Sequence, residues 1–219
     1  MRLKGIDPVL IIALVLVQLI GFLGVFSATY KDGISPLFLK QFLYVVFGWI
    51  MLIVITFTNF RMLYDMAPVI YMLNLFFLVL VPLFGKTVYG AKRWLDLGPF
   101  SLQPSEFMKF SLLLFITYIL GHTKKSISKE SVILALAFLI PAILTLKQPD
   151  LGTAVSYGVI LISLLFFKGV RLRFFFALGL LLLVLSPLAW HFLKDYQKER
   201  IMAVIDPYAD YAGGGYQLI

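Results

Sequence analysis

The stretch "PVLIIALVLVQLIGFLGVFSA", residues 8 to 28, carries no charged side chain. An α-helix rises about 1.5 Å per residue and the hydrocarbon core of a bilayer is about 30 Å thick, so about 20 apolar residues span it. The stretch is too long for the apolar region of a signal peptide and has no convincing small-residue cleavage site. We therefore expect these residues to form a membrane helix that the mature protein retains.

The rest of the chain repeats this pattern. Of its 219 residues, 61% are hydrophobic and 14% are charged, and the mean hydropathy is +0.97, which lies outside the range of soluble domains. We predict an all-α polytopic membrane protein with seven transmembrane helices, of which the fourth and fifth are short unless their polar flanks are also helical. The apolar runs are 8–28, 38–57, 66–84, 107–120, 132–146, 151–167 and 174–192.

The cysteine count and the charge distribution argue against two classes of protein, those that use thiol chemistry and those that bind nucleic acid. The chain has no cysteine, which excludes disulfides and thiolate chemistry. The net charge is +8, but the basic residues are scattered in short loops rather than gathered in one stripe, which argues against a nucleic-acid partner. We interpret these residues as topology signals and as contacts for anionic lipid.

The short basic loops also predict the orientation. With the N-terminus in the cytoplasm, the basic residues divide almost evenly between the two sides, but the two tightest clusters, "HTKKSISKES" (122–131) and "KGVRLR" (168–173), both lie inside. This favours a cytoplasmic N-terminus. We expect a transmembrane bundle over residues 1–194 with an outer loop at 85–103, followed by an extracytoplasmic segment at 195–219. Any chemistry is expected in the outer segments.

The stretch "LQPSEFMK" (102–109) carries charge into the start of an apolar helix. Proline is favoured at the first helical position, so Pro104 predicts a helix start and places Glu106 in the first turn, near the positive end of the helix dipole. Lys109 is three residues on and shares its face. Two interpretations stay open, a cap with a local ion pair or part of a functional site. A Ser105–Lys109 nucleophile pair is less favoured than a capping hydroxyl.

A second stretch, "KQPDLGTA" (147–154), repeats the Gln-Pro-acid start, with Asp150 as the acid. In the predicted topology both helices start at the outer face, so two helix N-termini converge there and offer unpaired backbone N–H groups to an anion. With Arg93, Lys147 and Lys109 nearby, this is a seat for a phosphate or diphosphate. Carboxylates beside it can accept protons or hold a divalent cation such as Mg²⁺ or Mn²⁺, although no cofactor is certain.

Three motifs in order resemble the shape, elongation, division and sporulation (SEDS) family. They are "GAKRWLDLGPFSLQPSEFMK" (90–109), "QPDLGTA" (148–154) and "RIMAVIDPYADYAGGGYQ" (200–217). The stretch "FLKDYQKERI" (192–201) is more similar to the RodA branch than to the FtsW branch. The resemblance covers the N-terminal two-thirds of the family: family members resemble ten-helix proteins, and the aspartate expected to act in catalysis lies in a later His-Thr-Asp-Phe motif. We therefore expect this chain to be truncated and inactive alone.

The resemblance implies a multi-pass enzyme of the bacterial cytoplasmic (inner) membrane. It implies a peptidoglycan glycosyltransferase that polymerises lipid II at the outer face for cell elongation and rod shape. Its implied partners are a class B penicillin-binding protein acting as transpeptidase and other membrane proteins of the elongation machinery. Combined with the charge pattern, it suggests supporting catalytic roles for Glu106, Lys109 and Asp150. Substrate-binding candidates are Arg93, Gln103, Ser105, Lys147, Gln148, Thr153 and Arg200.

Two other functions remain open. A flippase for lipid-linked precursors also needs charged residues inside a helical bundle, but it predicts a polar pathway that reaches the inner leaflet. The inner halves of these helices are almost purely apolar, which favours the enzyme. A non-catalytic membrane scaffold for a transpeptidase would tolerate replacement of both Glu106 and Asp150.

Overall fold

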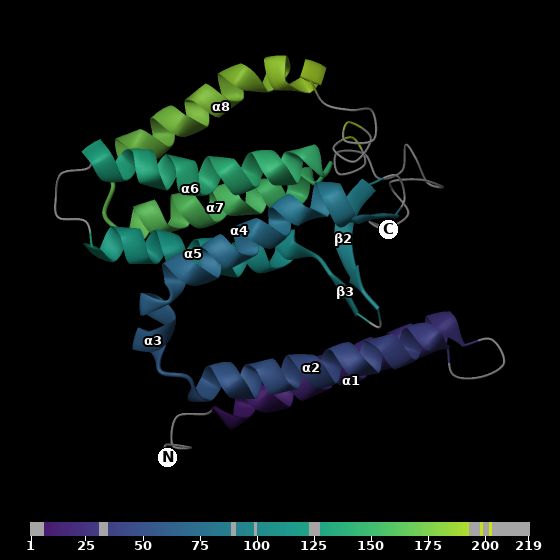
Figure 1. Ribbon diagram of the computed structural model, residues 1–219. Coiled ribbons are helices and arrows are strands. Elements are labelled where there is room, and N and C mark those ends of the chain that lie inside the picture. The colour runs from purple at the N-terminus through teal and green to yellow at the C-terminus, as the bar shows by residue number, and fades with distance from the viewer. Residues whose placement is uncertain are drawn as a thin grey trace. The chain divides into compact units, whose positions relative to one another are not determined.

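The computed structural model describes residues 7–30, 35–88, 91–98, 100–122, 128–192, 198 and 202. Most of them are helical, and each of the seven predicted apolar runs lies in a helix of its own, except that Met66, the first residue of the third run, precedes α4 (Figure 1). The seven helices are α1 (Pro8–Thr29), α2 (Pro36–Phe57), α4 (Ala67–Phe84), α5 (Pro104–His122), α6 (Ser128–Lys147), α7 (Leu151–Phe167) and α8 (Leu172–Phe192). The polar flanks of the fourth and fifth runs are helical, as their short length required.

The chain divides into two compact units, one of residues 1–66 and 95–102 and the other of residues 67–94 and 103–219. In the first unit, α1 and α2 each start at a proline, after Asp7 and Ser35 respectively. The Asp7 carboxylate accepts from Val9 N at 2.8 Å, and the Ser35 hydroxyl accepts from Leu37 N at 3.2 Å. These caps satisfy N–H groups that the helix itself leaves unpaired.

Neither α1 nor α2 has a buried residue, and apolar side chains are exposed along both helices. The two helices are linked by a polar contact in which Trp49 Nε1 donates to Gln18 Oε1 at 2.6 Å. Aromatic rings of α1 and α2, including Phe22 and Phe38 with ring centroids 5.7 Å apart, also pack together. An apolar surface of this extent suits contact with lipid.

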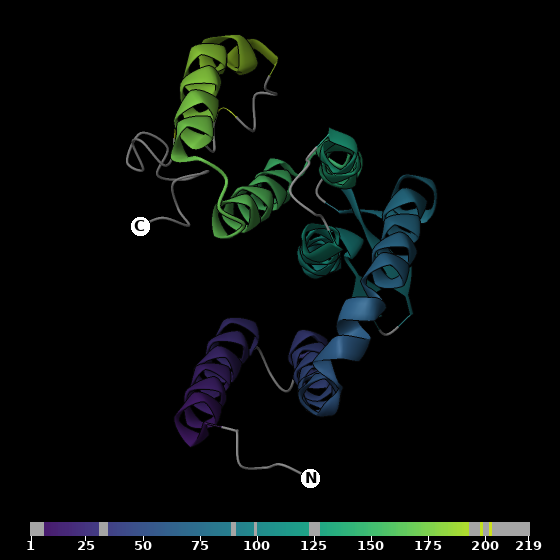
Figure 2. The ribbon, with the colours of Figure 1, turned by 90° about the vertical axis from the view of Figure 1, so that its left-hand side faces the viewer.

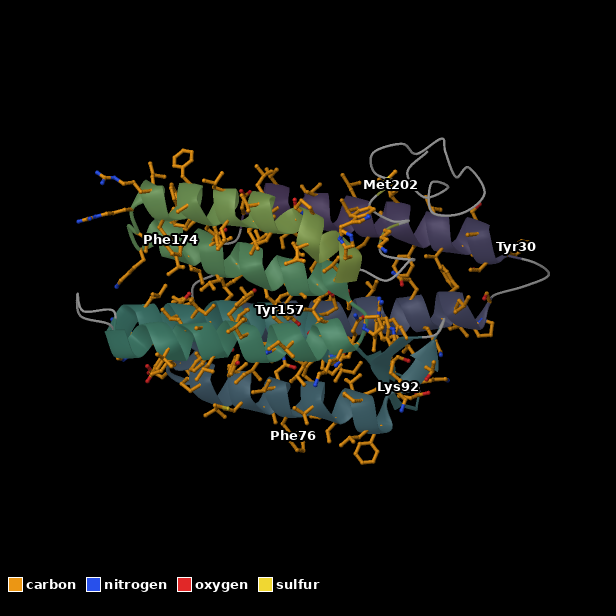
Figure 3. The ribbon with its side chains drawn as sticks, turned by 90° about the horizontal axis from the view of Figure 1, so that it is seen from above. Tyr30, Phe76, Lys92, Tyr157, Phe174 and Met202 are labelled. Carbon is orange, nitrogen blue, oxygen red and sulfur yellow. The ribbon has the colours of Figure 1, made fainter. Side chains whose placement is uncertain are left out.

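The second unit contains a four-helix core of α4, α5, α6 and α7 (Figure 1). Figure 2 shows α4, α5 and α6 side by side. The buried side chains of this core are mainly apolar. Figure 3 shows Tyr157 among these helices. Phe76, on α4, points away from the rest of the bundle. Its largest fully buried side chains include Leu78, Met108, Leu112, Ile116 and Tyr157.

The sequence analysis missed two kinds of element. A short helix, α3 (Phe60–Asp65), precedes α4, and Asn59 caps it through a 3.0 Å bond from Arg61 N. The expected outer loop 85–103 holds a three-stranded antiparallel sheet in the order β1-β2-β3, formed by β1 (Lys86–Val88), β2 (Ala91–Leu97) and β3 (Phe100–Leu102). Gly98, with φ +80°, starts the turn between the last two strands, where glycine avoids the strain of a side chain.

Within the described residues, three helices, α1, α2 and α4, are long and apolar enough to cross a membrane. Helices α6, α7 and α8 contain shorter apolar segments. The chain is therefore a mostly helical protein with membrane-type helices, and the predicted total of seven spans stays a proposal.

Candidate functional site

The site lies at the first turns of α5 and α7, both in the second unit. Helix α5 begins at Pro104 with Glu106 in its first turn, as predicted. Helix α7 is capped by Asp150, whose Oδ1 accepts from Thr153 N at 3.2 Å. A carboxylate in this position satisfies an unpaired N–H group and meets the positive end of the helix dipole.

Side-chain hydrogen bonds join the two helix starts. Gln103 Nε2 donates to Asp150 Oδ2 at 3.3 Å, and Thr153 Oγ1 donates to Glu106 Oε1 at 3.4 Å. The predicted convergence of these two helix N-termini is therefore confirmed. Each helix contributes one acid, and each acid contacts the residues at the start of the other helix.

Arg93, on β2, binds the turn that leads into α7. Its Nε donates to the Gln148 carbonyl at 3.0 Å, its Nη2 donates to the Pro149 carbonyl, and its Nη1 lies 3.9 Å from Asp150 Oδ2. A guanidinium has five donors in a fixed plane, which suits it to holding several acceptors at once. Arg93 thus holds this turn in place, and only 21% of its side chain is exposed.

Glu106 and Lys109 form the local ion pair that their spacing predicts. Lys109 Nζ lies 2.9 Å from Glu106 Oε2, and the two side chains are 33% and 49% exposed, respectively. An ion pair this exposed contributes only about 0–1 kcal/mol to stability. The pair therefore adds little to the fold, and both of its charges are accessible to a ligand.

Asp150 differs from Glu106 in its surroundings. Its side chain is 11% exposed, and its two oxygens already face Thr153 N, Gln103 Nε2 and Arg93. Ser105 is fully buried, and its hydroxyl accepts from Gln103 Nε2 at 3.2 Å. Because Ser105 bonds Gln103 and Lys109 pairs with Glu106, the geometry does not support a Ser105–Lys109 nucleophile.

Tyr157 belongs to this site and was missed by the sequence analysis. Its fully buried hydroxyl donates to the Ser105 carbonyl at 2.8 Å and lies 3.3 Å from Thr145 Oγ1. It thereby ties the first turn of α5 to α6 and α7. The spacing offered a signal, because Tyr157 follows Asp150 by seven residues and Thr153 by four, which places all three on one face of a helix.

The remaining candidates divide in three ways. Gln148 is buried, and its Nε2 donates to the Leu78 carbonyl of α4 at 3.2 Å. Lys147 lies in the last turn of α6 with its side chain exposed. Arg200 and the rest of the third motif after Met202 lie outside the described residues.

The acids of this site are Glu106 and Asp150. Among the residues described here, no group of three or more His, Cys, Asp or Glu side chains could hold a metal ion. A divalent cation held by one or two carboxylates together with substrate phosphates stays a prediction.

The sequence matches the model of the FtsW/RodA/SpoVE family, described as cell cycle protein, over residues 7–219. The chain belongs to this family. It is the SEDS family that the motifs resemble. The peptidoglycan glycosyltransferase MrdB of Escherichia coli K12 is 31% identical over 218 residues, which are 98% of this chain and 58% of MrdB. Curated FtsW proteins are similar at comparable identity.

Solved structures share the SEDS fold. A chain of a peptidoglycan synthase complex, described as coordinating polymerization and crosslinking, matches with a TM-score of 0.81 and 31% identity, over 98% of this chain and 63% of its own length. The crystal structure of Thermus thermophilus RodA, a rod shape determining protein, matches with a TM-score of 0.65 and 29% identity, over 81% of this chain and 60% of RodA. The chain thus spans about three-fifths of the length of these relatives.

Proposed function

We propose that this chain forms part of a peptidoglycan glycosyltransferase that polymerises lipid II during cell elongation. The observation that carries the proposal is the junction of the two helix starts, where Thr153 Oγ1 bonds Glu106 Oε1 and Gln103 Nε2 bonds Asp150 Oδ2. The similarity to MrdB, which is named a peptidoglycan glycosyltransferase, supports the reaction class.

The reaction places defined demands on such a site. An acceptor sugar hydroxyl forms a bond to the anomeric carbon of the donor sugar, the bond from that carbon to undecaprenyl diphosphate breaks, and the hydroxyl proton passes to a base. Negative charge grows on the departing diphosphate, and a cation beside it lowers the barrier. We assign this role to Lys109, which Glu106 holds at 2.9 Å. In this proposal the base is the aspartate of the His-Thr-Asp-Phe motif that the family resemblance implies.

The buried residues of the site have a different role in this proposal. Asp150 already accepts from Thr153 N and Gln103 Nε2 and faces Arg93, so its free capacity for substrate is small. We assign Asp150, Arg93 and Gln103 to positioning the two helix starts. Lys147 remains a substrate-binding candidate because its side chain is exposed.

The membrane arrangement follows from the same proposal. The N-terminus lies in the cytoplasm of a bacterium, seven helices cross the inner membrane within residues 1–194, and the loop 85–103 and the segment 195–219 lie outside. The site then faces the side where lipid-linked sugars are polymerised. A class B penicillin-binding protein is the expected partner, which the likeness to a chain of a peptidoglycan synthase complex supports.

The test is polymerisation of labelled lipid II by the purified full-length protein with its transpeptidase partner. We expect Lys109→Gln to lower the rate by about 100-fold at matched folded amounts, because it removes the cation beside the departing diphosphate. Glu106→Gln should lower the rate as well, because Lys109 loses the carboxylate that holds it. Thr117→Ala is the matched control on the same helix, since its hydroxyl donates to the Leu113 carbonyl of its own helix. Unchanged glycan synthesis by both charge variants would refute the proposed site.

The same samples separate the enzyme from the flippase. A flippase whose pathway uses Glu106 and Lys109 would lose transport of lipid II across vesicles in these variants, while a separate polymerase would make glycan normally. Loss of polymerisation with transport unaffected would support the enzyme. A scaffold would leave both readouts unchanged.

A further inference from the structure

Three of the described helices contain an internal proline, at Pro82 in α4, Pro141 in α6 and Pro187 in α8. Proline has no backbone N–H, so the carbonyl four residues earlier loses its partner in the helix. The carbonyls released in this way belong to Leu78, Ala137 and Leu183. In a bilayer, water does not replace the lost bond, so a released carbonyl needs another hydrogen-bond donor from the protein.

Each released carbonyl accepts a hydrogen bond from a side chain instead. Tyr71 OH donates to the Ala137 carbonyl at 2.9 Å, and Ser186 Oγ donates to the Leu183 carbonyl at 2.7 Å. Gln148 Nε2 donates to the Leu78 carbonyl at 3.2 Å. In α8 the donor to the released carbonyl comes from the same helix, whereas in α4 and α6 it comes from another part of the bundle.

The Gln148 contact is the one that reaches the candidate site. Gln148 is 2% exposed and lies in the turn between α6 and α7, two residues before the Asp150 cap. Its amide oxygen, Oε1, has no hydrogen-bond partner among the described residues. The orientation of the amide is therefore set by the donor, because a flipped amide would place an oxygen against the Leu78 carbonyl.

Two contacts hold the turn before α7 from different elements. The Gln148 side chain fastens it to α4 through the Leu78 carbonyl, and Arg93 on β2 binds the Gln148 and Pro149 carbonyls. The Asp150 carboxylate, which caps α7 and bonds Gln103 next to α5, follows directly. The position of Asp150 therefore depends on where this turn is held.

We propose that Pro82 and Gln148 are a matched pair, in which the proline opens a carbonyl on α4 and Gln148 docks on it to position the two helix starts. Gln148 is then a positioning residue of the transfer site. Its sequence motif alone predicts a substrate-binding role, and this proposal replaces that role. The effect on the reaction rate rests on the proposed function. The hydrogen bond from Gln148 to the Leu78 carbonyl is tested by the unfolding midpoint, which does not depend on the proposed function.

The pair makes a specific prediction about suppression. Gln148→Met removes the donor and leaves the Leu78 carbonyl buried and unpaired, so we expect about a tenfold lower polymerisation rate and a lower midpoint of thermal unfolding. Pro82→Ala restores an N–H that bonds the same carbonyl within α4. In the Pro82→Ala background, Gln148→Met should therefore change the midpoint by less than about 1 °C, while the rate stays about tenfold lower because the turn is still not fastened to α4.

Pro141 and Tyr71 supply the matched control. Tyr71→Phe unpairs the Ala137 carbonyl, and Pro141→Ala should restore its stability through the same mechanism on another helix. Crossed combinations, such as Gln148→Met with Pro141→Ala, should remain additive because the two prolines do not release the same carbonyl. All variants are made in the full-length protein with its partner, and kcat and KM are measured at matched folded amounts.

The possible outcomes separate the interpretations. Rescue of the unfolding midpoint by Pro82→Ala, with kcat still low and KM unchanged, supports the pair and its positioning role. A midpoint that Pro82→Ala does not rescue, or a kcat that it restores together with the midpoint, would overturn the proposal. A higher KM with kcat unchanged would assign Gln148 to substrate and overturn it as well. If Gln148→Met does not fold, failure of Pro82→Ala to restore folded protein overturns it as well. If the wild-type protein polymerises nothing, the proposed function fails, while the unfolding midpoints still test the pair.

Discussion

The α1–α2 helices and the α4–α7 bundle are both rich in apolar residues, but different interactions determine how the helices pack in each. Neither α1 nor α2 has a buried residue, and a Gln18–Trp49 bond provides a polar link between them. The bundle buries polar side chains at most of its helix junctions. These are Asn74, Ser105, Ser111, Thr145, Gln148, Asp150 and Thr153.

This difference indicates how each region gains its structure. Lipid is as apolar as the side chains of α1 and α2, so burial in a membrane drives insertion of these helices but distinguishes poorly among packing arrangements. In the bundle, a wrong arrangement leaves polar groups unpaired. Asn74 Nδ2 donates to Ser111 Oγ at 2.9 Å, and Tyr157 OH donates to the Ser105 carbonyl at 2.8 Å, so α4, α5 and α7 fit in one register.

An aspartate caps the N-terminus of a helix in each region, and we expect the largest effect on the unfolding free energy from comparing these two caps. Asp7 caps α1 at an exposed position, and Asp150 caps α7 at a buried one. We expect Asp7→Ala to cost about 1 kcal/mol of unfolding free energy, the usual value of a cap. Asp150→Ala should cost about 3 kcal/mol, because it also leaves Arg93 without its carboxylate.

Chemical unfolding of the purified full-length protein in detergent measures both costs. Asp150→Asn separates the two contributions, because it retains a capping oxygen and loses the charge. Equal costs for Asp7→Ala and Asp150→Ala would show that burial does not distinguish the two regions.

We expect a smaller effect on stability from removing one side-chain hydrogen bond in each region, made by a tyrosine hydroxyl in the bundle and by a glutamine amide between α1 and α2. Tyr157→Phe removes a buried donor and leaves the Ser105 carbonyl and Thr145 without it, so we expect a loss of about 1–2 kcal/mol. Gln18→Leu unpairs Trp49 Nε1 between α1 and α2, where we expect about 0.6 kcal/mol, as is typical between membrane helices. The same unfolding measurement applies, and a larger cost for Gln18→Leu would reverse the comparison.

The smallest effect on stability is expected at the exposed charges of the bundle. Replacing Glu106 and Lys109 together, by Glu106→Gln and Lys109→Gln, should change the unfolding free energy by less than about 0.5 kcal/mol. The double variant should nevertheless lose polymerisation. A stability loss as large as that of Asp150→Ala would make the pair structural and would remove the reason to place it at the substrate.

Much of this fold could be predicted because its signals are local. Apolar runs of 14 to 21 residues predict the seven long helices. Pro104 predicts the start of α5, because proline suits the first helical position. The recurrence of a Gln-Pro-acid start predicted that α5 and α7 begin together. Two of the three strands between α4 and α5 are only three residues long, so the sequence shows no alternating pattern there and predicts a loop.

The contacts that could not be predicted join residues far apart in the sequence. Gln148 and Leu78 are 70 residues apart, and Tyr71 and Ala137 are 66 apart. The internal prolines were visible, but a proline indicates only which carbonyl is released and not which side chain will bind it. For this reason the motif predicts a substrate contact for Gln148 and indicates no role for Tyr157.

The released carbonyl on α4 also has a consequence for the order of biogenesis. Because Gln148 follows Leu78 by 70 residues, it leaves the ribosome roughly 4 to 14 s later at about 5–20 residues per second. During that interval Leu78 sits in a helix that has been synthesised without its final partner. Newly made α4 therefore carries an open acceptor until the α6–α7 turn has been synthesised and Gln148 can bind it.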